Sequence, residues 1–303
     1  MSPKACSVVA ATLFLASLGA PGDEPAPAAG KPTAVEGKAR SADGIEIAYD
    51  TRGKGEVTLV FVHGWCGDRS FWREQLDVFA EKYRVVSLDL AGHGASGKDR
   101  AEWTADAFAA DVEAVVKAAD VKRAILVGHS MGGPISLLAA KRMPDRVAAV
   151  VGVDTLHNVE FKWPEEQTKQ FLAMFDADFE GTTRMFLKGM LPADADPALA
   201  KYVMDKVLGA DRKMATGAMR ALTAFDAKAA LAGAKVPVRC INAAPGLPFA
   251  IATAVDVNRK YGDFDVVLME GVGHFPMLEK PKEFNEKLAE QLKKLETTPA
   301  KNE

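Results

Sequence analysis

Apolar residues follow two alternating patterns along the chain from about residue 33 onward. Short unbroken apolar runs indicate strands that are buried on both faces, whereas apolar residues spaced three or four positions apart indicate amphipathic helices. The runs predict strands at 34–40, 44–50, 57–64, 83–90, 124–130, 146–154, 236–242 and 264–270. The spacing predicts helices at 70–82, 104–119, 131–142 and from Pro281 onward. This alternation favours an α/β fold with a mostly parallel sheet covered by helices on both faces.

The alternation stops in one long segment, residues 156–223. This segment has no strand-like run, and it contains six of the eleven methionines of the chain. We predict a helical cap here, inserted into a core formed by 34–155 and 224–296, with a short tail at 297–303. Most of its apolar side chains should pack within the cap itself. Flexible apolar side chains that face the core would suit a hydrophobic substrate pocket.

The N-terminal segment has the pattern of a secretion signal. Lys4 precedes an uncharged apolar run at 6–20, which ends in small residues. A stretch rich in Pro, Ala and Gly follows at 21–33 and is interpreted as a flexible linker. A membrane anchor or a helix of the fold is the alternative, but the run is short for an anchor. We therefore predict a signal peptide at 1–20 and an exported protein, periplasmic or secreted, with no stable membrane span after its removal.

Composition adds a few limits. Hydrophobic residues make up 48% and charged residues 26% of the chain, as is usual for a globular protein. The net charge of −3 gives no electrostatic reason to expect nucleic acid as a partner. Outside the predicted signal, Cys66 and Cys240 lie on separate predicted strands. We favour two buried thiols over a disulfide.

The motif GHSMGG (128–133) lies between a predicted strand and a predicted helix. A G-x-S-x-G sequence in this context is typical of a nucleophile elbow, a sharp turn that exposes a serine hydroxyl. The helix that follows directs its positive end toward developing negative charge. Ser130 is therefore the candidate nucleophile.

A serine nucleophile needs a general base, and the best candidate is His274. It lies in EGVGHFPMLEKP, just after the last predicted strand, where it can reach over the sheet edge toward Ser130. The other histidines are His63, His93, His129 and His157. We interpret His63 and His93 as loop-structuring residues and His129 as turned away from the nucleophile. We interpret His157 as a surface or hinge residue at the start of the cap.

Two backbone N–H groups are candidate donors to an oxyanion. The Met131 N–H follows the nucleophile at the helix N-terminus, and the Trp65 N–H lies in the loop after the strand at 57–64. The Trp65 ring either lines the acyl side of the pocket or packs in the core.

The segments VHGW, DLAGHGASG, GHSMGG and GVGHFPMLEKP have the order and spacing of the α/β-hydrolase superfamily. Residues 35–296 resemble its carboxylesterase, arylesterase and haloperoxidase-like branch. The resemblance implies an eight-stranded sheet, a helical cap, a Ser–acid–His triad, and neither a cofactor nor a metal. Haloalkane dehalogenases and epoxide hydrolases are similar but carry an aspartate where Ser130 stands, which argues against both activities.

The acid of the triad departs from this family pattern. The family usually places it a few residues after the strand that corresponds to 236–242, but VPVRCINAAPG (236–246) contains no carboxylate. Asp154 ends the earlier strand RVAAVVGVD, at the sheet edge expected for Ser130 and His274. We therefore predict Asp154 as the acid, the alternative being that it only ties down the first turn of the cap. Asp89 and Ser96 are interpreted as loop-structuring residues.

These residues predict a serine hydrolase that cleaves a small, hydrophobic carboxylic ester through an acyl-enzyme. The same triad could instead act on a lactone, an amide or a C–C bond, or form peracids. The missing acid at 242–246 motivates a different class of function, a non-catalytic ligand-binding protein on the same fold. The sequence does not indicate the oligomeric state.

Overall fold

An eight-stranded sheet forms the centre of the computed structural model, which describes residues 33–162, 164–246 and 252–297. The strand order is β1-β2-β4-β3-β5-β6-β7-β8. Strands β3 to β8 run parallel to one another, and β1 and β2 form an antiparallel edge. The strands are β1 (Val35–Arg40), β2 (Glu46–Arg52), β3 (Val57–Val62), β4 (Arg84–Leu88), β5 (Arg123–His129), β6 (Val147–Val153), β7 (Val238–Ala243) and β8 (Phe264–Met269). Each lies within a few residues of its predicted position, and the predicted fold class is confirmed.

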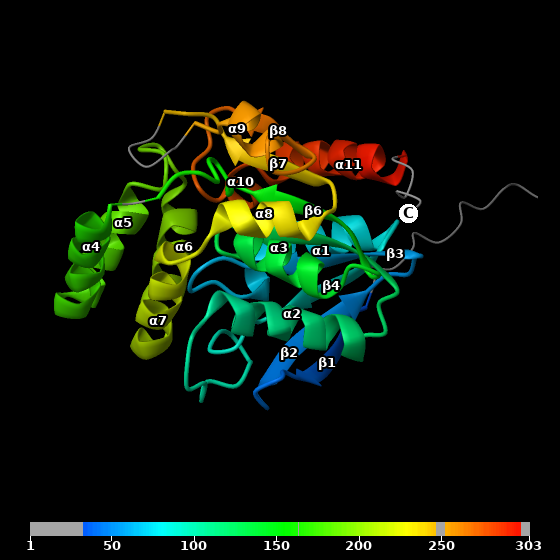
Figure 1. Ribbon diagram of the computed structural model, residues 1–303, viewed down its shortest axis with the longest axis horizontal. Helices are drawn as coiled ribbons and strands as arrows, with labels where there is room; N and C mark the ends of the chain where they lie inside the picture. The colour runs from blue at the N-terminus through cyan, green and yellow to red at the C-terminus, as the bar shows by residue number, and fades with distance from the viewer. Residues whose placement is uncertain (1–32, 163, 247–251, 298–303) are drawn as a thin grey trace, which may run out of the picture. The chain divides into compact units, whose positions relative to one another are not determined.

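Helices cover both faces of the sheet (Figure 1). Helices α2 (Ala105–Ala118), α3 (Gly132–Arg142) and α8 (Ala227–Ala234) pack side by side as one layer. Helix α1 (Arg73–Ala80), preceded by the 3₁₀ turn η1 (Arg69–Trp72), contacts α11 (Pro281–Thr297) in the other. The short helices α9 (Val255–Arg259) and α10 (Pro276–Glu279) accompany the last strand. The predicted helices are all present.

The core follows from the two apolar patterns. Five consecutive residues of β3, from Thr58 to Val62, are buried, as expected for a central parallel strand with helices on both sides. In α2, Phe108, Val112 and Val115 share the buried face, and the Thr104 side chain caps the helix by accepting the Ala107 N–H. In both elements, the apolar residues that predicted the element are thus the residues that are buried in the core.

The segment between β6 and β7 is helical, as predicted. It contains α4 (Glu165–Ala177), α5 (Phe179–Lys188), α6 (Pro197–Leu208) and α7 (Arg212–Thr223), followed by α8. The last three of these four helices begin at an aspartate whose carboxylate accepts a backbone N–H of the first turn: Asp178, Asp196 and Asp211. Such caps define where helices start in a segment without strands. We call α4–α7 the cap.

Both thiols outside the N-terminal segment behave as predicted, because Cys66 and Cys240 are free and buried. The predicted signal at 1–20 and nearly all of the predicted linker lie outside the described residues. Within the part of the chain that is described, no helix combines the length and the apolar character needed to cross a membrane.

Candidate active site

Ser130 occupies a strained turn between β5 and α3. Its φ of 50° lies in the left-handed region, and its N–H donates to the Val153 carbonyl at 2.9 Å. A Cβ on Gly128 would lie 2.3 Å from the carbonyl oxygen of Gly132, so only glycine fits at 128. Such a strand–turn–helix geometry is that of a nucleophile elbow, and a non-glycine residue at positive φ is kept only where surrounding contacts hold it.

Asp154 lies directly after the neighbouring strand β6 and contacts His274. The distance from Asp154 Oδ2 to His274 Nδ1 is 2.6 Å. The other carboxylate oxygen accepts the Ala243 N–H at 2.9 Å, and Asp154 is buried with a φ of 44°. The structure therefore brings the predicted acid and the predicted base together, from residues that are 120 positions apart in sequence.

Burial by itself raises the pKa of the Asp154 carboxyl. The hydrogen bond from His274 and the attraction of His274 and His157 outweigh this effect, so the pKa of Asp154 lies below its usual value. A carboxylate that is ionised at neutral pH can hold the His274 proton on Nδ1 and stabilise an imidazolium.

His157, which we predicted to be a surface or hinge residue, is half-buried. Its side chain is 17% exposed, and its Nε2 lies 3.7 Å from Asp154 Oδ1. Its Nδ1 lies 3.2 Å from the Thr253 hydroxyl. Burial lowers the pKa of His157, with Asp154 opposing this shift. The carboxylate of Asp154 thus faces two imidazoles, and sequence reasoning had placed only one of them there.

The backbone of His274 is held from two sides. Its N–H donates to the carbonyl of Met190 in the loop after α5 at 2.8 Å. Its carbonyl accepts the Nε2–H of His129 at 2.7 Å, and the two imidazole rings lie 4.8 Å apart. Burial, followed by repulsion from His274, lowers the pKa of His129 to about 3, so this ring is neutral. His129 therefore supports the candidate base, a contact that the prediction of a ring turned away from the nucleophile did not include.

Glu279 is a further residue that sequence reasoning missed. Its two carboxylate oxygens accept the N–H groups of Gly273 at 2.6 Å and Phe275 at 2.8 Å, the residues on either side of His274. Burial raises the pKa of Glu279. The sequence GVGHFPMLEKP contains this signal, because Glu279 follows His274 by five residues and lies in the short helix α10, close enough to accept backbone N–H groups around the histidine.

The loop after β3 lies against the elbow. A Cβ on Gly64 would be 3.1 Å from the Cβ of Ser130, which shows how closely this loop approaches the nucleophile. Trp65 follows, and its ring packs edge-on against Phe175 and Phe186 of the cap. Its indole N–H donates to the Ala215 carbonyl in α7 at 2.8 Å. The ring thus packs against the cap. A role of the ring beside the acyl group and the oxyanion roles of the Trp65 and Met131 N–H groups stay predictions.

Both loop histidines have structural contacts, as predicted. His63 Nε2 accepts the Leu90 N–H at 3.0 Å, and its Nδ1–H donates to the Gly64 carbonyl at 2.8 Å. Both ring nitrogens are therefore occupied, and burial lowers the pKa of the ring. His93 Nδ1 contacts the Ala91 carbonyl at 2.9 Å.

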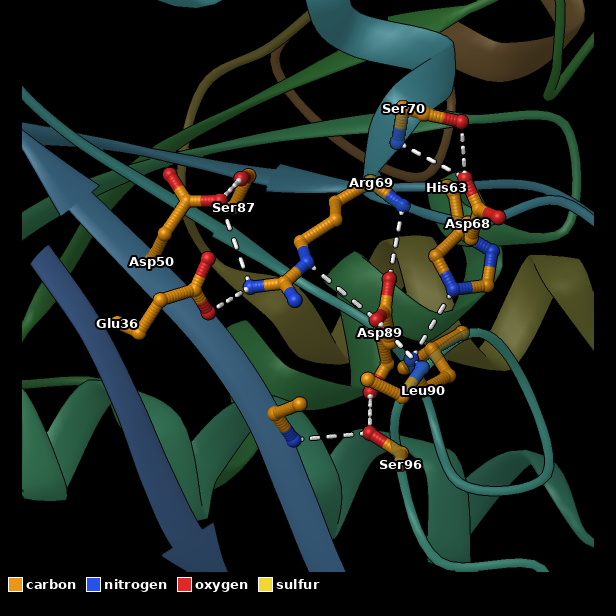
Figure 2. A network of polar contacts seen from close by, with 12 residues as sticks. Glu36, Asp50, His63, Asp68, Arg69, Ser70, Ser87, Asp89, Leu90 and Ser96 are labelled. Atoms are coloured by element: carbon orange, nitrogen blue, oxygen red, sulfur yellow. Dashed lines mark hydrogen bonds and ion pairs between the residues drawn. The ribbon is translucent and has the colours of Figure 1, made fainter. Parts of the chain in front are cut away.

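Asp89 and Ser96 organise the neighbouring loop (Figure 2). Asp89 accepts the backbone N–H of Arg69 at 2.9 Å, and the Ser96 hydroxyl donates to the Asp89 carbonyl at 2.6 Å. The Arg69 guanidinium extends between Asp89, Asp50 and Glu36. This network ties the loops after β3 and β4 to the antiparallel edge of the sheet, so the prediction of loop-structuring roles is confirmed.

The family model for the alpha/beta hydrolase fold matches residues 57–188. The strand order and the elbow agree with this match, and the chain has the α/β-hydrolase fold. The pimeloyl-[acyl-carrier protein] methyl ester esterase of Yersinia pseudotuberculosis is 28% identical to this chain over 250 residues, covering 79% of this chain and 94% of that protein.

Two further proteins are similar to this chain. The solved structure of Est816, described as an N-acyl homoserine lactone degrading enzyme, has a TM-score of 0.73 and 27% identity. The alignment covers 84% of this chain and 99% of that one. The acetyltransferase component of an acetoin cleaving system from Cupriavidus necator is 40% identical over 108 residues, 36% of this chain. The match spans only 29% of that relative.

Proposed function

We propose that this protein is a serine hydrolase that cleaves carboxylic esters through an acyl-enzyme. The observation that carries the proposal is the 2.6 Å contact between His274 Nδ1 and Asp154 Oδ2, at the sheet edge where the elbow presents Ser130. A ligand-binding protein would have no need to keep an acid–imidazole pair at the same sheet edge as a strained serine. The esterase and lactone-degrading relatives support the same class of reaction.

The proposed mechanism assigns one role to each residue. Because Asp154 holds a proton on Nδ1, the Nε2 of His274 is free to accept the proton of the Ser130 hydroxyl as its oxygen attacks the ester carbonyl. The N–H groups of Met131 and Trp65 stabilise the oxyanion. The tetrahedral intermediate then collapses, the alkoxide leaves with the proton from His274, and an acyl-enzyme is formed. Water, deprotonated by the same imidazole, attacks the acyl-enzyme and releases the acid.

A small apolar crevice, with room for about one water molecule, lies beside the elbow. It is lined by Ala105, Phe108, Met131, Pro134, Ile135, Ala218, Ala221, Leu222 and Phe225. None of these side chains is charged, so the surface beside the elbow suits an apolar part of a substrate better than an ionised one. A lactone is a cyclic ester that the same triad would open, and the similarity to Est816 makes lactones the second class to test.

A graded series of p-nitrophenyl esters tests the proposal together with the acyl-chain length that the site accepts. The wild-type protein is expected to hydrolyse the acetate and butyrate, and Ser130→Ala is expected to lose this activity. Ser136→Ala, in the same helix but with its hydroxyl hydrogen-bonded to the Gly132 carbonyl, is a matched control that should stay active. Equal hydrolysis by Ser130→Ala and wild type would remove Ser130 from the mechanism.

A further inference from the structure

Asn242 lies near the end of β7, just before the turn in which the family resemblance leads one to look for an acid. Its side chain is completely buried, with 0% of its surface exposed. The side-chain oxygen accepts the Thr155 N–H at 3.1 Å, and the side-chain nitrogen donates to the Thr155 carbonyl at 3.0 Å. One amide group thus satisfies both backbone groups of a single residue on the neighbouring strand end.

Thr155 is the residue next to the candidate acid, and it also contacts the candidate nucleophile. Its hydroxyl donates to the Ser130 carbonyl at 2.9 Å. The residues on both sides of Thr155 have left-handed backbones, with φ of 44° at Asp154 and 52° at Leu156. Non-glycine residues in this region persist only where the surrounding structure holds them. The amide of Asn242 is the side chain that holds the middle of this strained turn.

A second path leads from Asn242 back to the carboxylate. The Asn242 nitrogen donates to the Thr253 hydroxyl at 2.9 Å, and that hydroxyl lies 3.2 Å from His157 Nδ1. If the hydroxyl donates to Nδ1, the proton of the His157 ring is on Nε2, which faces Asp154 Oδ1 at 3.7 Å. The next residue in the strand, Ala243, donates its N–H to the same oxygen.

We propose that Asn242 is a positioning residue for Asp154, holding the carboxylate in the orientation in which it meets His274. This inference rests on the proposed function, since it assigns Asn242 a role in the same triad. An amide is required because one group must both donate to and accept from the Thr155 backbone, and an ionised carboxylate can only accept. The end of β7, which is followed by no acid, therefore supports the acid that follows β6.

The test compares Asn242→Ala with Asn258→Ala, measured on p-nitrophenyl acetate. Asn258 is a stringent control because it is also fully buried and its amide also clamps backbone, but at Leu156 and Val159, farther along the chain from Asp154 than the Thr155 that Asn242 holds. Asn242→Ala is expected to lower kcat by about 10- to 100-fold with little change in KM, since small misplacements of catalytic groups have effects of this order. Asn258→Ala is expected to lose similar thermal stability but keep kcat within about threefold.

The pH profile of kcat supplies a readout that a loss of stability alone would not move. The ionisable groups around His274 are Asp154, His157, His129 and Glu279. A displaced Asp154 stabilises the imidazolium less, so the midpoint of the acid limb should move to lower pH in Asn242→Ala and stay in place in Asn258→Ala.

Two outcomes separate this inference from the proposed function. If wild type hydrolyses the ester and Asn242→Ala does so with unchanged kcat and midpoint, the positioning role is wrong while the hydrolase stands. If the folded wild type neither hydrolyses the ester nor reacts with a fluorophosphonate, both fail. Should Asn242→Ala not fold, Asn242→Asp keeps the shape and the acceptor but loses the donor; it is expected to lose at least about tenfold in kcat, and full activity would overturn the proposal.

Discussion

At the scale of single residues, the contacts of Asp154 give the strongest support for a catalytic triad. It is buried, its φ is positive, and its two oxygens contact different elements, His274 after β8 and Ala243 at the end of β7. The alternative of an aspartate that only ties down the first turn of the cap does not require a hydrogen bond to an imidazole. The contact with His274 supports the catalytic interpretation, because orienting an imidazole is what a triad acid does.

Asp154→Asn is expected to lower kcat by about three to four orders of magnitude while the fold is kept, since the amide favours the wrong tautomer of His274. Steady-state kinetics and circular dichroism measure the two effects. Asp256→Asn is the matched control, because this aspartate is almost fully exposed on α9. Near-wild-type turnover in Asp154→Asn would remove Asp154 from the mechanism.

Glu279→Gln addresses the clamp around His274. The amide oxygen can replace only one of the two carboxylate acceptors, and its NH₂ group then faces the N–H of Gly273 or Phe275. We expect kcat to fall by about tenfold, with a smaller effect on KM. Glu283→Gln in α11 is the comparison, and equal activity of the two variants would contradict a positioning role for Glu279.

At the scale of elements, the hydrophobic pattern predicted each strand and the helices α1, α2, α3 and α11, because burial and periodicity are local properties. It did not predict α8, a short helix of mostly alanine whose apolar spacing is weak. It also predicted the edge at which Ser130, Asp154 and His274 meet, since parallel strands end at the same side of a sheet. The hydrogen bonds that hold these three residues in place could not be predicted from the sequence. Asn242 and Thr155 are 87 positions apart, and His129 and His274 are 145 apart. Such hydrogen bonds depend on side-chain directions that no spacing encodes.

The cap and the core are joined at Trp65, which makes the attachment of the cap testable. Trp65→Phe keeps an aromatic ring among Phe175 and Phe186 but removes the hydrogen bond to Ala215 in α7. The loss should cost about 1 kcal/mol. We expect faster hydrogen exchange in α4–α7 with unchanged exchange in α2 and α3; unchanged exchange in the cap would show that this bond does not hold it.

At the scale of the whole molecule, buried histidines link stability to pH. Burial is the largest cause that lowers the pKa of both His93 and His129 to about 3, from the usual 6.5. Below pH 6.5 the unfolded chain binds protons at these positions and the folded chain does not. Their contribution to stability is therefore complete above pH 6.5 and is lost as the pH falls toward 3.

Urea unfolding at pH 7.5, 6.0 and 5.0 measures this effect. The free energy of unfolding is expected to fall by up to about 1.4 kcal/mol per pH unit for each such histidine. In His93→Gln, the free energy of unfolding should change less steeply with pH, by about the contribution of one histidine. A free energy that stays constant between pH 7.5 and 5.0 would show that these rings do not stay neutral in the folded protein.

The central claim is that Ser130 is a nucleophile activated by His274 and Asp154, and covalent labelling tests it most directly. The folded protein is incubated with a fluorophosphonate, and the modified residue is located by mass spectrometry of its peptides. We expect a single adduct on Ser130, absent in Ser130→Ala and formed far more slowly in His274→Ala and Asp154→Asn. A folded wild-type protein that forms no adduct, or forms it on another residue, would contradict the account.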